Sequence, residues 1–241
     1  MERFAYLLSI TVCLICQHIS LAQGQRPYRV ITQDEKGRLV TVENFSGTWY
    51  SPTYLGTPYL NDKVWHYGYL VYRNQHKVPA AIAYNLVVDQ IYCGLSDSVA
   101  IVQALPDEFL FEGRRFISDP YKVLGIQRVT YYEVLYDGPT KLFCRWSKQF
   151  RPIDRKLYTR RTPPEDRFDG KYILSKDLYL QKPGDRPRFI IPTEYSLSRV
   201  LPDMGPELAD FIAAHSQNLT DDVLIEALVR YDKRHPSEQS Q

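Results

Sequence analysis

The chain has 241 residues, with 30 Lys or Arg side chains against 28 Asp or Glu, so its formal net charge is only +2 at pH 7. This balance argues against nucleic-acid binding and against attachment to a membrane through a polybasic surface. Tyrosine is abundant, with 19 residues, and this composition favours β-strands.

Residues 1–22 have the pattern of a cleaved signal peptide. Arg3 precedes an apolar run over residues 4–16, and the small residues Ser20 and Ala22 precede the expected cleavage position. The run is shorter than the roughly 20 residues of a membrane-spanning helix. We therefore expect an exported protein, periplasmic or extracellular, with no transmembrane span in its mature form.

After the signal we expect an N-terminal extension, residues 23–46, with a strand or two around the Lys36-Gly37 turn, and then an antiparallel β-region, residues 47–194. In that region, short runs rich in Val, Ile, Tyr and Phe alternate with polar or Gly/Pro turns. A segment with three prolines and the Arg160-Arg161 pair, residues 152–170, predicts a long loop. Such a basic loop could bind an anion, but a solvated loop is the more common outcome.

The clearest hairpin has its turn at Asp137-Gly138, between YYEVLY and KLFCRWS. Its second strand contains Cys144, and an earlier strand contains Cys93. In an oxidising compartment these two cysteines could form one disulfide. A small buried hydrophobic side chain at each position explains them equally well.

Residues 195–235 change to a helical period. Pro206 is placed to begin one helix and Thr220 to cap a second, whose last turn carries basic residues. The apolar stripes of two such helices need a partner, and a sheet is the only large one. The predicted fold is α+β and mainly β: an antiparallel sandwich-like structure or partly closed roll with two C-terminal helices packed on it.

Catalytic motifs are absent from the mature sequence: it has no nucleophile elbow, no zinc-binding helix, no phosphate loop and no dinucleotide fingerprint. We expect no cofactor and no metal site. The weak catalytic candidates are Glu133, Asp62, Asp89 and His66. Glu133 lies among aromatic residues that could raise its pKa, but a solvent-facing position on an edge strand is the simpler interpretation.

An aromatic segment is the strongest remaining signal. Exposed aromatic faces bind sugars or peptides in many exported proteins, whereas packing within the sheet explains tyrosines in strands. The candidate partner-binding residues are Tyr59, Trp65, Tyr67, Tyr69 and Tyr72.

Three features resemble a group of uncharacterised exported β-rich proteins from Bacteroidota-type bacteria. They are the GTPYLND segment at residues 56–62, the later Tyr84-Asn85 pair, and the hairpin at Asp137-Gly138. Two positions depart from the group: the turn at residues 73–77 lacks its usual glycine, and Ala83 replaces a common basic residue. The resemblance implies export and a β-rich fold, and it implies no activity.

These patterns favour a non-catalytic binding or assembly module of the cell envelope, with an envelope protein, a peptide or a glycan as partner. A hydrolase acting on envelope material through a carboxylate and a histidine is the alternative. A purely structural subunit that covers the sheet edge of a partner is a second alternative. The sequence does not determine an oligomeric state.

Overall fold

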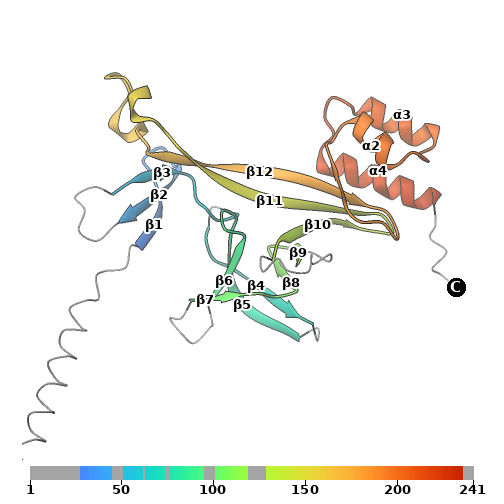
Figure 1. Cartoon of the computed structure of the whole chain (residues 1–241), viewed down its shortest axis with the longest axis horizontal. Helices are drawn as coiled ribbons and strands as arrows, with labels where there is room; N and C mark the ends of the chain where they lie inside the picture. Colours follow the sequence, from blue (N-terminus) through green and yellow to red (C-terminus); the bar gives the residue numbers. More distant parts are fainter. Residues whose placement is uncertain are drawn as a thin grey trace, which may run out of the picture. The chain divides into compact units, whose positions relative to one another are not determined.

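The computed structural model describes residues 28–44, 51–61, 63–73, 76–94, 101–118 and 129–235. The expected signal peptide, residues 1–22, and the candidate acid Asp62 lie outside the described residues. The described chain is mainly β (Figure 1). Its largely antiparallel strands form a sheet that does not close on itself, and helices lie at its C-terminal end. This confirms the predicted fold class.

The chain forms two compact units. Unit 1 contains the described residues up to Thr57 together with Arg151–Tyr172, and unit 2 contains Pro58–Phe150 and the described residues from Ile173. In this grouping, the described residues of the N-terminal extension and of the Pro/Arg-rich loop belong to the same unit. The long strands β11 (Lys141–Pro152) and β12 (Gly170–Gln181) contribute residues to both units.

Unit 1 begins with the hairpin of β1 (Tyr28–Gln33) and β2 (Leu39–Asn44), as the Lys36-Gly37 turn predicted. Gly37 has a φ of 72°, a left-handed conformation that glycine adopts without steric cost. The short strand β3 (Thr53–Leu55) pairs antiparallel with β2 and parallel with the start of β12. Two single-turn helices, η1 (Arg155–Leu157) and η2 (Pro164–Asp166), interrupt the Pro/Arg-rich loop.

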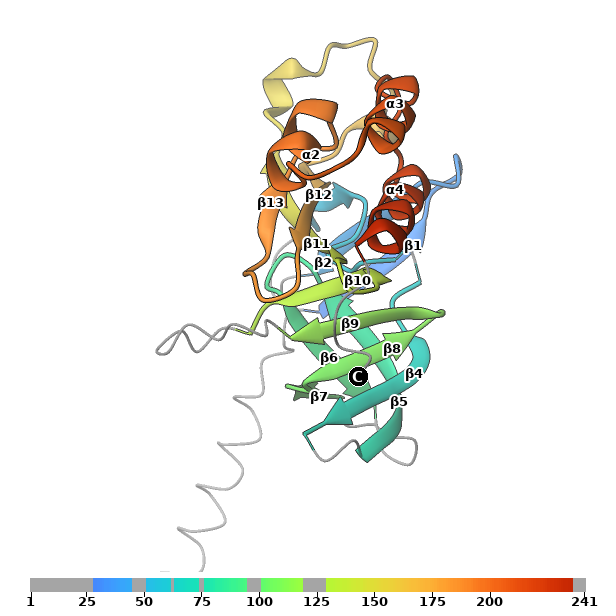
Figure 2. The same ribbon diagram turned by 90° about the vertical axis from the view of Figure 1, so that its right-hand side faces the viewer.

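Unit 2 contains a sheet in which β12 and β11 are followed by β10, β9, β8, β4, β5, β6 and β7 (Figure 2). Their bounds are β4 His66–Tyr72, β5 His76–Asn85, β6 Gln90–Gly94, β7 Ile101–Ala104, β8 Glu108–Phe111, β9 Arg114–Ser118, β10 Tyr131–Asp137 and, paired with β12, β13 Arg188–Ile190. Neighbouring strands from β10 to β7 run antiparallel. The hairpin predicted at Asp137-Gly138 is the β10–β11 pair.

Three helices follow in the described part of unit 2: α2 (Glu194–Val200), α3 (Pro206–Ala214) and α4 (Asp221–Arg234). The last two are the predicted helices, and the short α2 was not predicted. Thr220 caps α4 by accepting a hydrogen bond from the Val223 amide at 3.4 Å. None of the described helices is long and apolar enough to cross a membrane.

The helices pack on β10–β13 through a hydrophobic cluster that includes Leu142, Leu180, Ile212 and Leu224. Asp232 of α4 also bonds to the β10–β11 hairpin, because its carboxylate accepts the Thr140 amide at 3.1 Å and the Tyr136 hydroxyl at 2.9 Å. Burial and the bond to Asp232 raise the pKa of Tyr136 to about 12. The helices are therefore tied to the sheet by polar as well as apolar contacts.

A second hydrophobic cluster lies against β4–β10 and combines aliphatic side chains with a group of aromatic rings, so we call it the aromatic cluster. Phe109 and Phe116 stack with their centroids 4.6 Å apart, while Tyr84 and Tyr131 meet Phe109 edge-on at 5.4 and 5.2 Å. Stacked and edge-on aromatic pairs of this kind stabilise a core beyond their area burial. This cluster makes the inner face of β4 a core face.

Cys93 and Cys144 are free, buried thiols in the structure. Cys93 belongs to the aromatic cluster beneath β4–β10, and Cys144 belongs to the cluster beneath the helices. The structure thus shows no Cys93–Cys144 disulfide, and each thiol packs as a small apolar side chain. Burial raises the pKa of Cys144 to about 12, which keeps the thiol protonated.

Candidate functional site

The aromatic strand β4 turns two tyrosines away from the core. Tyr67 is 89% exposed and Tyr69 is 50% exposed, whereas His66 and Leu70 on the opposite face are buried. This alternation follows from the two-residue period of a β-strand. Side chains two residues apart lie roughly 7 Å apart along a strand, so the two rings form a row.

Beside this row, small residues of β5 and β6 form the floor of a hollow. Ala81 pairs with Tyr67 on one side and with Gly94 on the other, and Pro79 pairs with Tyr69. We call this hollow the tyrosine trough; its volume is about 620 Å³. Its lining residues are Tyr67, Gly68, Tyr69, Pro79, Ala80, Ala81 and Gly94.

The depth of the trough follows from the absence of side-chain bulk. Among the described residues, a Cβ atom added to Gly94 would meet only the Cβ of Ala81, at 3.9 Å, so none of them fills the space above Gly94. On β7, the exposed side chain of Ile101 stands opposite Gly94. Across the sheet, the large side chains of Tyr67 and Ile101 therefore lie on either side of the small residues Ala81 and Gly94.

Gly68 has a different role, because β4 and β8 approach closely at this position. A Cβ atom on Gly68 would lie 2.0 Å from the Leu110 carbonyl oxygen and 3.0 Å from the Phe111 Cβ. Only glycine fits between these two strands. Gly68 thus sets the position of the strand that carries Tyr67 and Tyr69.

The other three aromatic candidates do not line the trough. Tyr72 lies on the opposite face of β4, where burial raises its pKa. Tyr59 forms an isolated bridge with Asn85, and Trp65 is half-buried just before β4. The structure thus brings together two of the five predicted residues and adds a floor that the sequence analysis missed.

Glu133 does not face solvent as expected. It lies on β10, which is flanked by β9 and β11 rather than forming an edge, and it is only 7% exposed. Both of its carboxylate oxygens accept hydrogen bonds from Arg114, each at 2.7 Å, and one also accepts the Trp146 indole N–H at 2.6 Å.

This arrangement gives Glu133 a structural role. Burial opposes the charge on Arg114, but the hydrogen bonds to Glu133 leave the pKa of the guanidinium above its usual value. The Arg114 guanidinium also lies over the Trp146 ring, with its carbon 5.4 Å from the ring centroid. Glu133, Arg114 and Trp146 thus form one group, held together by hydrogen bonds and a cation–π contact across β9, β10 and β11.

The remaining catalytic candidates also have partners of their own. The two ring nitrogens of His66 lie 2.6 Å from the Lys63 carbonyl oxygen and 2.6 Å from the Glu112 carboxylate. Asp89 is buried and accepts the Tyr84 hydroxyl at 2.5 Å. Glu133, His66 and Asp89 thus belong to three different hydrogen-bonded groups.

In the part of the chain that the structure describes, no group of three or more His, Cys, Asp or Glu side chains could hold a metal ion. Comparison with protein-family models, with curated proteins and with solved structures found no match for this chain.

Proposed function

We propose that this protein is an exported, non-catalytic binding module of the cell envelope, and that it binds an extended polypeptide segment with apolar side chains in the tyrosine trough. The observation that carries the proposal is the exposure of Tyr67 and Tyr69 beside the open floor of Ala81 and Gly94. Tyrosine is enriched at protein interfaces, where its ring supplies contact area and its hydroxyl reaches water.

The lining of the trough favours a polypeptide over a glycan. Among its described lining residues are two tyrosines, one proline, two alanines and two glycines, without a charged or amide side chain. A sugar needs several hydrogen-bonding groups to compensate for the loss of water from its hydroxyls. An apolar side chain, or a proline stacked on a tyrosine, needs none, as in the aromatic-lined grooves that bind proline-rich segments.

A hydrolase remains the weaker proposal. It needs an acid and a base that converge on one bond, with glycoside cleavage placing two carboxyl groups roughly 5 to 9.5 Å apart. Glu133 instead neutralises Arg114, and His66 and Asp89 bond to other partners. The described contacts of Glu133, His66 and Asp89 give each of them a role in packing or charge pairing.

We expect Tyr67→Ala to weaken peptide binding about tenfold or more, because truncation of an aromatic hot-spot residue at the centre of an interface costs about 2 kcal/mol or more. Peptides would be selected from a phage-displayed random library on the mature protein. The affinity of the synthetic peptides would then be measured by fluorescence anisotropy.

The matched control is Tyr195→Ala, since Tyr195 is 72% exposed on α2 and does not line the trough. Its affinity for the selected peptides should stay within twofold of wild type. A glycan array would be probed in parallel with the same proteins. Selected peptides that bind wild type and Tyr67→Ala equally, or binding of glycans alone, would contradict the proposal.

A further inference from the structure

A second hollow, in unit 1, is lined by arginines. Its volume is about 450 Å³, and three guanidinium side chains, those of Arg155, Arg160 and Arg167, contribute to it. The other described lining residues are Ser51, Thr53, Tyr158, Thr159 and Phe168, so no carboxylate is among them. We call this hollow the arginine pocket.

Two of the three arginines keep their charge unneutralised. Arg155 bonds to the carboxylate of Asp169. Arg167 instead donates from Nε and Nη2 to the Thr162 carbonyl oxygen, at 3.0 and 2.7 Å. Within the part of the chain that the structure describes, neither Arg160 nor Arg167 forms an ion pair. The pocket therefore carries an excess of positive charge.

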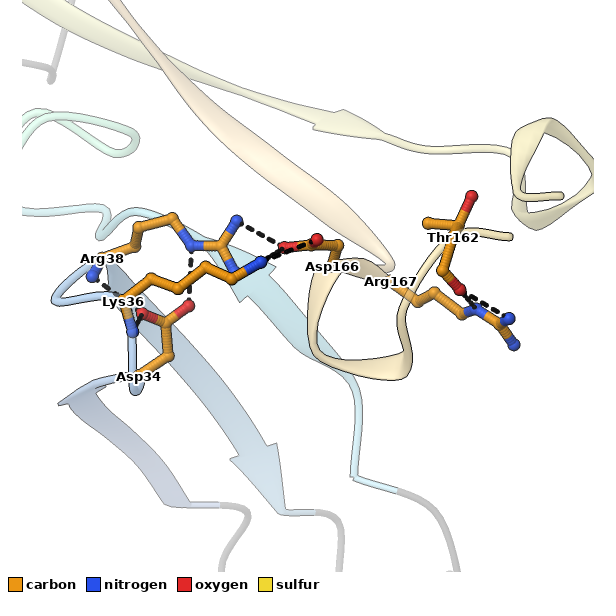
Figure 3. A network of polar contacts seen from close by, with 6 residues as sticks. All are labelled: Asp34, Lys36, Arg38, Thr162, Asp166 and Arg167. Atoms are coloured by element: carbon orange, nitrogen blue, oxygen red, sulfur yellow. Dashed lines mark hydrogen bonds and ion pairs between the residues drawn. The ribbon is translucent and has the colours of Figure 1, made fainter. Parts of the chain in front are cut away.

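The loop that supplies these residues is held in place by its acidic side chains. Figure 3 shows Asp166 and Arg167, adjacent in sequence, extending in opposite directions. Asp166 lies 2.8 Å from Lys36 Nζ and 2.9 Å from Arg38 Nη1. Hydrogen bonding from Lys36 lowers the pKa of Asp166, so the carboxylate stays charged at neutral pH. The Asp166 carboxylate therefore pairs with Lys36 and Arg38 and does not neutralise Arg167, which extends the other way.

Backbone and ring contacts complete this framework. The Tyr158 hydroxyl donates to the Phe168 carbonyl oxygen and accepts the Phe168 amide, both at 3.0 Å. The Asp169 amide donates to the Thr53 carbonyl oxygen at 2.7 Å, and the Thr53 amide donates back to the Asp169 carboxylate at 2.9 Å. The Arg38 guanidinium lies over the Phe168 ring at 5.1 Å. The loop expected to be merely solvated is thus organised around the pocket.

We propose that the arginine pocket binds a phosphate or sulfate group, carried by a small molecule whose body occupies the rest of the hollow. Guanidinium groups present paired N–H donors that match the oxygens of a tetrahedral anion. Ser51 and Thr159, which also line the pocket, carry hydroxyl groups that can act as neutral donors. The volume falls within the range of roughly 300 to 1,000 Å³ for small-molecule sites and exceeds what a bare oxyanion needs.

Isothermal titration calorimetry on the mature protein tests this proposal, with inorganic phosphate, inorganic sulfate, glucose 6-phosphate and glucose as probes. We expect the anionic probes to bind and glucose not to bind. Arg160→Gln should weaken anion binding about tenfold to a hundredfold, the effect of losing a hydrogen bond to a charged group. Tighter binding of glucose 6-phosphate than of phosphate supports a phosphorylated small molecule as the ligand, whereas equal binding of the two would contradict a ligand whose body occupies the rest of the hollow.

Arg161→Gln is the matched control, because it removes the same charge from the neighbouring position, which is not among the lining residues. It should leave the affinity within about twofold of wild type. Arg160 makes no described hydrogen bond in the loop, so Arg160→Gln leaves the framework intact. Equal losses in the two variants, or no anion binding by wild type at millimolar concentration, would overturn the proposal. Neither result bears on the tyrosine trough, whose residues belong to unit 2.

Discussion

Replacing Arg114 with alanine is expected to lower the free energy of unfolding by about 3 kcal/mol. The substitution leaves the buried carboxylate of Glu133 without its charge partner, and breaking a buried ion pair in this way costs about 3 to 5 kcal/mol. We place the effect at the lower end because Arg114 keeps 26% of its side chain exposed. Equilibrium unfolding in urea, followed by tryptophan fluorescence, measures the change.

Two further variants separate the buried charge from other effects. Arg188→Ala removes an exposed arginine 3.8 Å from Asp185, and it should cost less than about 1 kcal/mol. The double variant Arg114→Met, Glu133→Leu should recover much of the lost stability, since it removes both charges and keeps apolar volume. If Arg114→Ala matches Arg188→Ala, Glu133 is not held by this pair and its assignment as a structural residue fails.

Gly68→Ala should disrupt the sheet at the centre of unit 2. The new methyl group would meet a backbone oxygen of β8 at 2.0 Å, and a backbone atom cannot rotate away as a side chain can. Overpacking typically costs about 1 to 3 kcal/mol, and we expect at least the upper value because β4 and β8 must separate. Urea unfolding, together with amide hydrogen exchange in β4 and β8, would report both the loss and its location.

Gly94→Ala provides the comparison for this substitution within the same sheet. Among the described residues, its methyl group would meet only the Ala81 Cβ, at an ordinary contact distance of 3.9 Å. The stability should stay within about 0.5 kcal/mol of wild type, as for surface substitutions that meet no obstacle. Equal destabilisation by Gly68→Ala and Gly94→Ala would mean that the close approach of β4 and β8 is not the cause.

Local patterns in the sequence predicted the elements that local chemistry controls. The Asp137-Gly138 turn and the Thr220 cap lie within a few residues of the strands and helix they determine. The strand β8 and the parallel pairing of β3 with β12 were not predicted. Each is short, so periodicity carries little signal, and β3 pairs with residues more than a hundred positions away.

For the candidate sites, too, the sequence predicted features set by neighbouring residues but not those set by the pairing of distant strands. The exposed row of Tyr67 and Tyr69 could be anticipated from their spacing, but the floor at Ala81 and Gly94 depends on the register of two further strands. The burial of Glu133 depends on Arg114, a residue of the neighbouring strand rather than of its own hairpin. A register between strands cannot be inferred from one sequence without knowledge of their pairing.

The sequence raised anion binding by the Pro/Arg-rich loop only as the less common outcome, and it could not place the arginine pocket for a related reason. Its walls combine residues 51–53 with residues 155–168, two segments that are far apart in the chain. The loop composition alone favoured a solvated segment, because mixed charges usually face water. What distinguishes this loop is the pairing of Asp166 with Lys36 and Arg38 from the N-terminal hairpin.

Filling the tyrosine trough is the most direct test of the proposed binding function. Gly94→Leu places a bulky side chain on the floor, and we expect the fold to be preserved because the Cβ atom meets only Ala81, at 3.9 Å, among the described residues. The affinity of a selected peptide would be measured by fluorescence anisotropy for wild type, Gly94→Ala and Gly94→Leu, each with an unchanged urea midpoint. We expect Gly94→Leu to lose tenfold or more in affinity, a factor that corresponds to about 1.4 kcal/mol, and Gly94→Ala to bind nearly as wild type. Undiminished binding by a correctly folded Gly94→Leu protein would contradict the proposed binding function.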